Sequence, residues 1–281
     1  MAKTSANKAR QFFGPTGLLA GWHPRFEFRP GQLEMAEAVE AALAEKQHLI
    51  VEAGTGTGKT LAYLVPAILF GKRVVVSTGT KNLQEQIFYK DIPFLERHLG
   101  QRLRVCYMKG RNNYACRQKI YDAQNEPVLS GLEEISEYQI IREWEKITET
   151  GDRAEIRELP EWSTLWPKLD ARRELCSGQK CPQFERCFIT RMLQRAHESD
   201  LIIVNHHLFF ADLAVKDEDW GGIIPEYAAV IFDEAHEIED IAGQYFGTSV
   251  SSHQVEELRR DVTRVARLKG FGSEPLDQLL A

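Results

Sequence analysis

The chain lacks the features expected of a membrane or secreted protein. Its longest apolar run, residues 61–70, contains a proline and falls well short of the ~20 residues that a membrane helix needs. Residues 1–14 contain Lys and Arg but no apolar segment, so we expect no secretory signal. Internal repeats and low-complexity tracts are also absent. We therefore expect a cytoplasmic protein without a membrane partner, in a reducing compartment where disulfides are rare.

An excess of positive charge is lacking too. The 281 residues include 35 Lys and Arg against 41 Asp and Glu, which gives a net charge of −6. This total argues weakly against nucleic acid as a partner, but it averages over segments of opposite sign. Residues 97–119 carry seven bases and no acid, residues 122–161 twelve acids and four bases, and residues 168–195 seven bases and three acids. The contents of 43% hydrophobic and 27% charged residues are those of a globular protein of one large or two small domains.

Short apolar runs alternate with helical patterns along much of the chain, which predicts an α/β fold with a parallel sheet. The expected strands are residues 48–53, 73–77, 103–108, 201–204 and 229–232, and the expected helices are residues 59–70 and 82–99. Residues 109–198 interrupt this alternation, so we interpret them as an insertion into the sheet domain. The tail from about residue 237 to residue 281 has a helical pattern.

A glycine-rich loop follows the first expected strand and opens a helix, which predicts a phosphate site. Its sequence is Ala-Gly-Thr-Gly-Thr-Gly-Lys-Thr at residues 53–60. Glycines let backbone N–H groups curl around phosphate oxygens, and the helix N-terminus adds its positive end. Lys59 would reach the β- and γ-phosphates of ATP, and the Thr60 hydroxyl suits Mg²⁺. The cofactor-binding residues are predicted to be Gln32, Ala53, Gly54, Thr55, Gly56, Thr57, Gly58, Lys59 and Thr60.

A second acidic site follows the last expected strand, where Asp233-Glu234-Ala235-His236 succeeds residues 229–232. A carboxylate at the C-terminal end of a strand projects into the crevice where α/β sheets bind ligands. Asp233 would hold Mg²⁺ together with Thr60, Glu234 would orient and deprotonate the attacking water, and His236 would relay the state of the γ-phosphate. A solvated helix start is the alternative for such an acidic cluster taken alone.

Two further segments suit a nucleotide or a nucleic acid. The Gln32 amide can pair with the N6/N7 edge of adenine, with a plain surface loop as the alternative. Residues 77–84 end a strand and begin a helix, so their hydroxyl and N–H groups can bind a nucleic-acid phosphate. An ordinary threonine N-cap is the alternative there.

Four of the five cysteines lie inside the insertion, with 59, four and five residues between successive members: Cys116, Cys176, Cys181 and Cys187. Four thiols in a reducing compartment indicate Zn²⁺ or an iron–sulfur cluster. The spacing lacks the pairs two residues apart that zinc knuckles favour, so we prefer a cluster, with zinc or unrelated thiols as alternatives. Cys106 alternates with its neighbours on an expected strand and is interpreted as a packing residue.

Two polar segments have competing interpretations. Residues 109–114 combine bases with an aromatic ring, which suits a surface that tracks a nucleic-acid strand, and a solvated loop is the alternative. Residues 205–207, Asn-His-His, suggest a metal site at first sight. A helix start after a strand is the better interpretation, and we assign them no catalytic role.

Taken together and in order, these motifs resemble those of DinG/XPD-type helicases, which are superfamily 2 iron–sulfur DEAH-box enzymes, over about residues 15–240. The resemblance implies a RecA-like domain with a mainly helical iron–sulfur insertion and the start of a helical arch domain. Residues 1–108 and 199–240 would form the RecA-like domain, residues 109–198 the insertion, and residues 241–281 the arch. The cofactors would be ATP, Mg²⁺ and a 4Fe-4S cluster held by the four cysteines.

The same resemblance implies an activity and its partners. It implies ATP-driven 5′→3′ translocation on single-stranded DNA, with unwinding at duplex junctions during repair or replication, by a monomer. Such enzymes need a second RecA-like domain, and no second α/β pattern is present, so we expect the N-terminal half of a motor. Two alternatives remain at this point: a cluster-bearing DNA or nucleotide binder without motor activity, and a zinc-containing P-loop ATPase with another substrate.

Overall fold

The computed structural model describes residues 8–22, 26–54, 56–124, 131–173, 176–216 and 222–248, together with Ser251, Ser252, Val255, Glu256, Arg259 and Val262. The chain divides into two compact units, residues 1–238 and residues 239–281. Almost all described residues belong to the first unit. In the second unit, α12 (Ile238–Phe246) begins at the boundary, and the described residues Ser252, Val255, Glu256, Arg259 and Val262 beyond it are also helical. The predicted helical tail is therefore observed in these residues, and residues 263–281 lie outside the described part.

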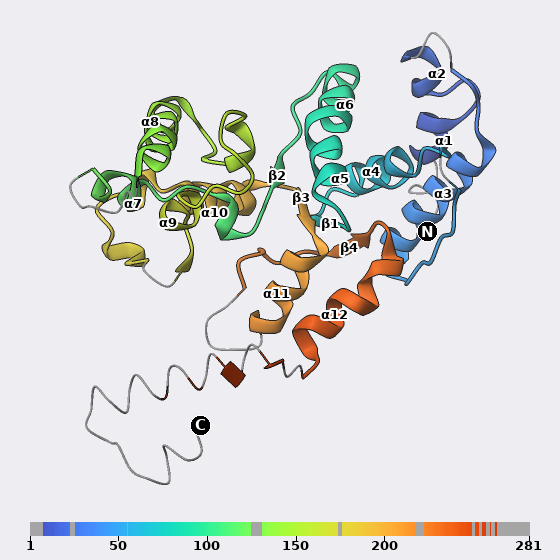
Figure 1. Ribbon diagram of the computed structural model, residues 1–281. Helices are drawn as coiled ribbons and strands as arrows, with labels where there is room; N and C mark the ends of the chain where they lie inside the picture. Colours follow the sequence, from blue (N-terminus) through green and yellow to red (C-terminus); the bar gives the residue numbers. More distant parts are fainter. Residues whose placement is uncertain are drawn as a thin grey trace. The chain divides into compact units, whose positions relative to one another are not determined.

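A parallel four-stranded sheet lies at the centre of the first unit, in the order β2-β3-β1-β4 (Figure 1). Its strands are β1 (Val74–Thr78), β2 (Val105–Tyr107), β3 (Leu201–Asn205) and β4 (Ala229–Phe232). Val75 of β1 pairs with Ile202 of β3 on one side and Val230 of β4 on the other. The three valines of β1 are fully buried, as a continuous apolar run in a central strand requires. The predicted parallel α/β architecture is confirmed.

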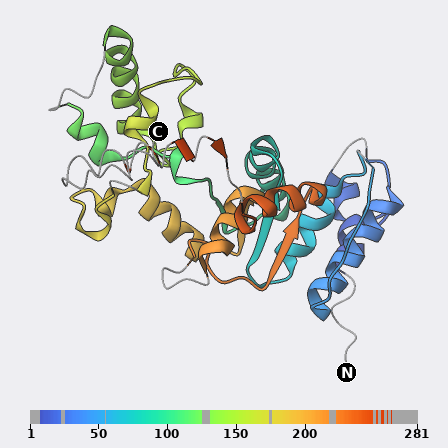
Figure 2. The same cartoon turned by 60° about the horizontal axis from the view of Figure 1, so that its bottom comes forward.

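The N-terminal helices pack together and onto the helix that follows the glycine-rich loop. These helices are α1 (Lys8–Phe13), α2 (Leu18–Trp22), α3 (Pro30–Glu45) and α4 (Lys59–Leu69). Their apolar faces share one core with the sheet, in which Phe12, Ala36 and Leu64 are almost completely buried. Figures 1 and 2 show these helices in blue and cyan, on the opposite side of the sheet from the green and yellow insertion.

The helix predicted at 82–99 forms, but with a change of pitch. It consists of α5 (Lys81–Gln86), a π-helical turn, η1 (Ile87–Asp91), and α6 (Ile92–Leu99). Pro93 has no N–H to donate to the carbonyl of Tyr89, so the regular ladder of i to i−4 bonds cannot continue through this point. π-helical turns are often found at functional sites, and this one lines a groove described below.

The insertion between β2 and β3 is built from short helices around a separate apolar cluster. Its α-helices are α7 (Arg117–Asp122), α8 (Gly131–Ile147), α9 (Trp166–Leu169) and α10 (Phe188–Glu198). Its 3-10 turns are η2 (Arg111–Asn113), η3 (Arg153–Glu155), η5 (Gly178–Lys180) and η6 (Phe184–Arg186). Ile141, Leu165 and Leu169 are fully buried in this cluster. The insertion therefore has a core of its own, and α10 contacts β2 at the edge of the sheet.

After the insertion the chain forms α11 (His206–Lys216) and, beyond β4, the 3-10 turn η7 (Ala235–Glu237). α11 starts directly after β3, with the Asn205 side-chain oxygen accepting a bond from the N–H of Leu208 at 2.8 Å. The helix start predicted for residues 205–207 is therefore confirmed. Among the described residues, no helix combines the length and apolar character needed to cross a membrane.

The strand predicted at residues 48–53 is wrong. This segment has no strand conformation and pairs with none of the four strands. Its apolar side chains face solvent, with exposed fractions of 42% for Leu49, 98% for Ile50 and 40% for Val51. Apolar composition indicates only that a segment can be buried in a sheet. To form a strand, the segment must also lie beside another strand whose backbone N–H and C=O groups can pair with it, and composition does not reveal such a neighbour.

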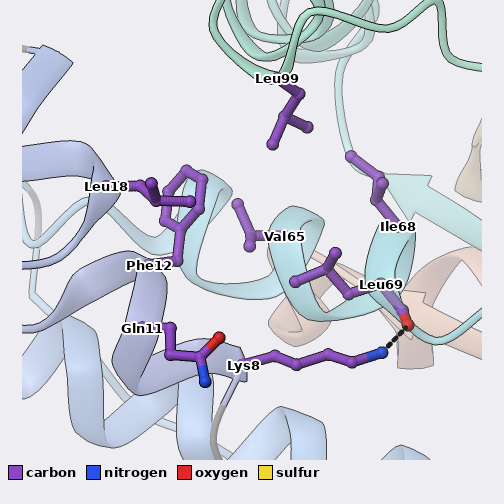
Figure 3. Close-up of a pocket in the computed structure, with 8 residues that line it drawn as sticks. All are labelled: Lys8, Gln11, Phe12, Leu18, Val65, Ile68, Leu69 and Leu99. Atoms are coloured by element: carbon purple, nitrogen blue, oxygen red, sulfur yellow. Dashed lines mark hydrogen bonds between the residues drawn. The ribbon is translucent and has the colours of Figure 1, made fainter.

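An apolar cavity of about 260 Å³ lies among the N-terminal helices (Figure 3). It is lined by Lys8, Gln11, Phe12, Leu18, Val65, Ile68, Leu69 and Leu99. The Lys8 ammonium donates to the carbonyl of Leu69 at 3.2 Å. The α4 residues that line the cavity come from the C-terminal half of that helix, whereas the glycine-rich loop precedes its N-terminus, so the cavity is separate from the predicted phosphate site.

Candidate nucleotide-binding site

The glycine-rich loop turns into α4 through glycines in the left-handed region. Gly56 has φ 79° and Gly58, the N-cap of α4, has φ 82°. A side chain at Gly58 would also collide with Gln32, whose Nε2 lies 2.2 Å from the position of an added Cβ. Gln32 donates from Nε2 to the Gly58 carbonyl at 3.0 Å. Gln32 and the loop, predicted to share one site, therefore do lie together, while Thr55 lies outside the described residues.

Lys59 is positioned between its own loop and the acidic motif. Its Nζ donates to the carbonyl of Ala53 at 3.2 Å and lies 3.8 Å from Glu234 Oε1. The side chains of Lys59 and Glu234 are 30% and 40% exposed, so both remain accessible from solvent. The structure therefore brings together a cation suited to phosphates and a carboxylate suited to activating water, as the sequence motifs predict.

Asp233 is held from inside the protein by a residue that sequence reasoning missed. Tyr63 donates its hydroxyl to Asp233 Oδ2 at 2.8 Å, and both residues are buried. Burial, and secondarily the Asp233 carboxylate, raises the pKa of Tyr63 well above its usual value, so the phenol stays a donor. Tyr63 lies one helical turn after Lys59, and this i, i+4 spacing places both on one face of α4. This spacing from Lys59 was the sequence feature that could have indicated a role for Tyr63 in the site.

Glu234 and His236 occupy the exposed side of the acidic motif. Glu234 adopts the left-handed region with φ 57°, a conformation that is uncommon for residues other than glycine. This conformation turns the chain directly after β4, while Asp233 Oδ1 accepts the Glu234 N–H at 3.0 Å. His236 Nδ1 lies 3.5 Å from Glu234 Oε2, and its side chain is 73% exposed. Such strain at a residue with predicted catalytic chemistry is consistent with a functional site.

His206 lies behind this motif and is fully buried. Its Nδ1 is 2.7 Å from Ser77 Oγ, and its Nε2 is 2.9 Å from the carbonyl oxygen of Asp233. Burial lowers the pKa of His206, so the ring is neutral at physiological pH. This histidine has no predicted catalytic role, and its sequence context did not indicate that it bridges β1 and the acidic motif.

The hydroxyl groups of residues 77–80 are bound within the protein. Ser77 and Thr78 are fully buried, with Ser77 bonded to His206 and Thr78 Oγ1 donating to the Thr80 carbonyl at 3.2 Å. Thr80 Oγ1 accepts the Leu83 N–H at 3.3 Å and caps α5. Ser77 and Thr78 therefore do not offer their hydroxyls to a phosphate, because buried hydroxyls satisfy their hydrogen bonds inside the fold. The alternative, a threonine N-cap, is confirmed.

Residues 109–114 do not form the nucleic-acid surface that their composition suggested. Lys109 is only 4% exposed and pairs with Asp152 at 2.6 Å and Glu85 at 3.1 Å. Tyr114 is equally buried, and its hydroxyl accepts the Lys109 N–H at 3.1 Å. A buried ammonium requires carboxylate partners, and the acids that provide them are distant in the sequence. This segment joins the sheet domain to the insertion.

A groove of about 300 Å³ does combine cations with rings where β2 meets the insertion. Its lining includes three arginines and three tyrosines: Arg102, Arg191, Arg195, Tyr89, Tyr107 and Tyr114. Tyr89, in the π-helical turn, is 55% exposed and packs edge-on against Tyr107. The Tyr107 hydroxyl is buried and has no hydrogen-bond partner among the residues that the structure describes. Arg102, Arg191 and Arg195 lie in the two basic stretches of the sequence.

The four cysteines of the insertion are free thiols at element ends and in turns. Cys116 is the N-cap of α7 and Cys187 that of α10, while Arg111 Nη2 lies 3.4 Å from the sulfur of Cys176. Burial raises the pKa of Cys116, with a smaller contribution from Cys187. Within the described residues, no three potential ligands form a ready metal site. The four thiols are therefore chemically suited to bind a metal ion or a cluster, but within the described residues they do not form a preassembled site.

Cys106 differs from the other four thiols. It is 4% exposed, with its sulfur 3.8 Å from the Met192 carbonyl. Burial raises the pKa of Cys106 to about 12, so this thiol stays protonated. It therefore lies in the interior, as expected of a packing residue.

Comparisons with known proteins agree with the motif order. Residues 30–151 match the family model described as DEAD/DEAH box helicase. The chain is 43% identical over 265 residues to the ATP-dependent DNA helicase YoaA of Haemophilus influenzae, covering 93% of this chain and 41% of that protein. It is 41% identical over 255 residues to the Escherichia coli protein of the same name, covering 89% and 40%. Against the ATP-dependent helicase DinG of Mycobacterium tuberculosis it is 32% identical over 259 residues, covering 84% and 38%.

These similarities confirm the predicted resemblance to DinG/XPD-type helicases. The chain spans about two fifths of the length of the curated relatives it matches, and the match extends over most of this chain.

Proposed function

We propose that this chain is the N-terminal motor portion of an ATP-dependent DNA helicase. The observation that carries the proposal is the joint placement of Lys59 and Glu234, 3.8 Å apart at the N-terminus of α4, with Asp233 held beside them by Tyr63. Similarity to proteins named as ATP-dependent DNA helicases supports the choice among P-loop activities.

The residues of this site divide the chemistry among them. Backbone N–H groups of residues 54–59 and the N-terminus of α4 bind the phosphates, and Lys59 leaves the Ala53 carbonyl to reach the β- and γ-phosphates. Gln32, beside Gly58, would bind the adenine edge. Glu234 orients the attacking water and accepts its proton, and the exposed His236 beside it senses the γ-phosphate.

A Mg²⁺ ion fits the donors at the base of this site. The Thr60 hydroxyl and the Asp233 carboxylate would hold it, and the Tyr63 hydroxyl on Asp233 Oδ2 fixes the orientation of that carboxylate. When bound, the ion neutralises negative charge on the phosphates. The Asp233 carboxylate is buried and oriented by a hydrogen bond, and carboxylate oxygens are the ligands that a hard cation prefers.

The expected activity is ATP hydrolysis that depends on single-stranded DNA. Phosphate release by a full-length form that includes this chain should rise when an oligothymidylate is added to ATP and Mg²⁺, whereas the 281-residue chain alone should show little or no hydrolysis because such enzymes need a second RecA-like domain. The control is the same measurement with Lys59→Ala, which removes the cation facing the phosphates. Equal wild-type rates with and without DNA would contradict the proposal.

The groove at the β2 edge is the preferred contact for the DNA strand. Arginines bind phosphates and aromatic rings stack on bases, and together they bind single strands without reading sequence. Following the resemblance, we propose 5′→3′ translocation, action at duplex junctions in repair or replication, a monomeric state and a cytoplasmic location. We assign residues 1–108 and 199–240 to the motor domain and residues 241–281 to the start of an arch.

We propose that residues 109–198 carry a 4Fe-4S cluster bound by Cys116, Cys176, Cys181 and Cys187. The donor chemistry fits: four free thiols occur in one insertion, two of them at helix N-termini, and a guanidinium lies beside a third. When bound, the cluster would crosslink the loops that carry these four residues.

Colour and metal content test this assignment. The anaerobically purified chain should be brown, absorb near 400 nm and contain about four iron and four sulfide per chain. Changing Cys176 to Ser should remove most of this absorbance, because one of the four ligands is lost. The matched control is Cys106→Ser, which alters a buried packing thiol and should leave the absorbance intact. Colourless protein with stoichiometric zinc would overturn the assignment.

A further inference from the structure

Arg117 carries a buried guanidinium inside the insertion, next to one of the four predicted cluster ligands. It is the first residue of α7 and directly follows Cys116, the N-cap of that helix. Its side chain is 5% exposed. A buried cation needs partners that replace its water, so the contacts of Arg117 show which parts of the insertion it holds together.

The guanidinium contacts the residues on both sides of Cys187. Its Nε donates to the carbonyl of Arg186 at 2.9 Å, across 69 positions of the sequence. Its Cζ lies 4.1 Å from the centre of the Phe188 ring, a cation–π contact with the first residue of α10. Cys187 lies between these two partners and is the N-cap of α10. The residue after Cys116 therefore fixes the backbone around a second cysteine that is distant in the sequence.

A further contact fixes the guanidinium itself. Arg117 Nη1 pairs with Glu145 Oε1 of α8, and both side chains are 5% exposed. The Tyr121 hydroxyl donates to the same Glu145 oxygen at 3.1 Å. Because α8 also supplies Ile141 and Trp144 to the apolar core of the insertion, Arg117 is anchored to that core as well as to the cysteine loops.

We propose that Arg117 is a positioning residue for the cluster, which holds Cys116 and Cys187 beside each other before iron binds. The inference rests on the proposed function, in which these thiols are two of the four ligands. Without such a clamp, the ends of a long loop must be brought together when the site forms, at a cost in chain entropy. Residues that orient metal ligands are worth about 10- to 100-fold in metal affinity, so the loss of Arg117 should be measurable.

Removing Arg117 alone leaves Glu145 as an unpaired buried charge, which destabilises a fold by itself. The test therefore uses the double variant Arg117→Met/Glu145→Gln, in which the amide oxygen still accepts the Tyr121 hydroxyl. The cluster-free double variant should have a free energy of unfolding close to that of the wild type, because replacing a whole buried ion pair is often neutral. Its loaded form, purified anaerobically, should lose iron to a chelator at least about tenfold faster than the wild type.

A thiol crosslinker measures the positioning directly and without the cluster. Dibromobimane reacts with two neighbouring thiols, and mass spectrometry of proteolytic fragments identifies the pair. In the cluster-free wild type it should join Cys116 to Cys187, and most of this crosslink should be lost in the double variant. The matched control is Arg186→Met, which removes an exposed cation beside Cys187 but keeps the carbonyl that Arg117 uses. It should behave as the wild type in both measurements.

The outcomes separate the role of Arg117 from the cluster assignment. A wild-type chain that holds no iron and sulfide refutes the cluster, and the inference with it. A loaded wild type beside a double variant with the same rate of iron release, or with an unchanged crosslink, overturns the role of Arg117 and leaves the proposed function standing. A double variant whose free energy of unfolding falls together with both readouts attributes the effect to folding, and overturns the role as well.

Discussion

Replacing Glu234 with Gln should lower DNA-stimulated ATP hydrolysis by a factor of ~10² to 10⁴, which is the range measured for removing a general base. The amide keeps the size of the side chain and still orients water through its oxygen, but it cannot accept a proton at neutral pH. ATP binding should persist, because the glycine-rich loop and Lys59 are unchanged. Loss of the carboxylate 3.8 Å from Lys59 also frees that cation for the phosphates.

Single-turnover phosphate release, with protein in excess over ATP, measures the hydrolytic step, and titration with a fluorescent ATP analogue measures binding. The matched control is Glu34→Gln on α3, which neutralises an exposed carboxylate outside the site and should hydrolyse ATP at the wild-type rate. A Glu234→Gln protein that hydrolyses ATP within a few fold of wild type would show that another group activates the water.

The parts of this fold that could be predicted are those encoded by neighbouring residues. Three consecutive valines specify the buried central strand β1, and the glycine-rich loop followed by Lys59 specifies the turn into α4. Residues 48–53 show the limit of such patterns. They are as apolar as β1, yet they lie exposed, because pairing depends on which strand is adjacent and not on local composition.

The residues of the candidate site also divide into those that local motifs predict and those that depend on distant partners. Lys59, Asp233 and Glu234 were predicted because their motifs are local. Tyr63 and His206 were missed because their roles depend on partners 170 and 27 residues away, through bonds that no motif describes. Lys109 was misplaced for the same reason, since a lysine in a basic stretch appears solvated until its carboxylate partners are known.

Replacing Lys109 with Met should destabilise the chain by about 3–5 kcal/mol, the usual cost of removing one partner from a buried ion pair. The side chains of Lys109 and Asp152 are 4% and 7% exposed and lie 2.6 Å apart. Without the ammonium, Asp152 is left as a charge with little access to water. Because Lys109 is the first residue of the insertion and also pairs with Glu85 of α5 at 3.1 Å, the loss falls on the junction between the sheet domain and the insertion.

Denaturant unfolding followed by tryptophan fluorescence measures this effect, and a second substitution identifies its cause. Adding Asp152→Asn to Lys109→Met removes the unpaired charge while keeping an oxygen for the N–H of Ala154, which Asp152 Oδ1 accepts at 3.0 Å. The double variant should therefore be more stable than Lys109→Met alone.

The control is Lys146→Met, which breaks the exposed pair with Glu143 and should lower the free energy of unfolding by less than about 1 kcal/mol. If Lys109→Met lowers the free energy of unfolding no more than Lys146→Met does, the buried pair does not stabilise the junction between the sheet domain and the insertion. If the double variant is no more stable than the single one, the loss comes from packing around the lysine stem and not from an uncompensated charge.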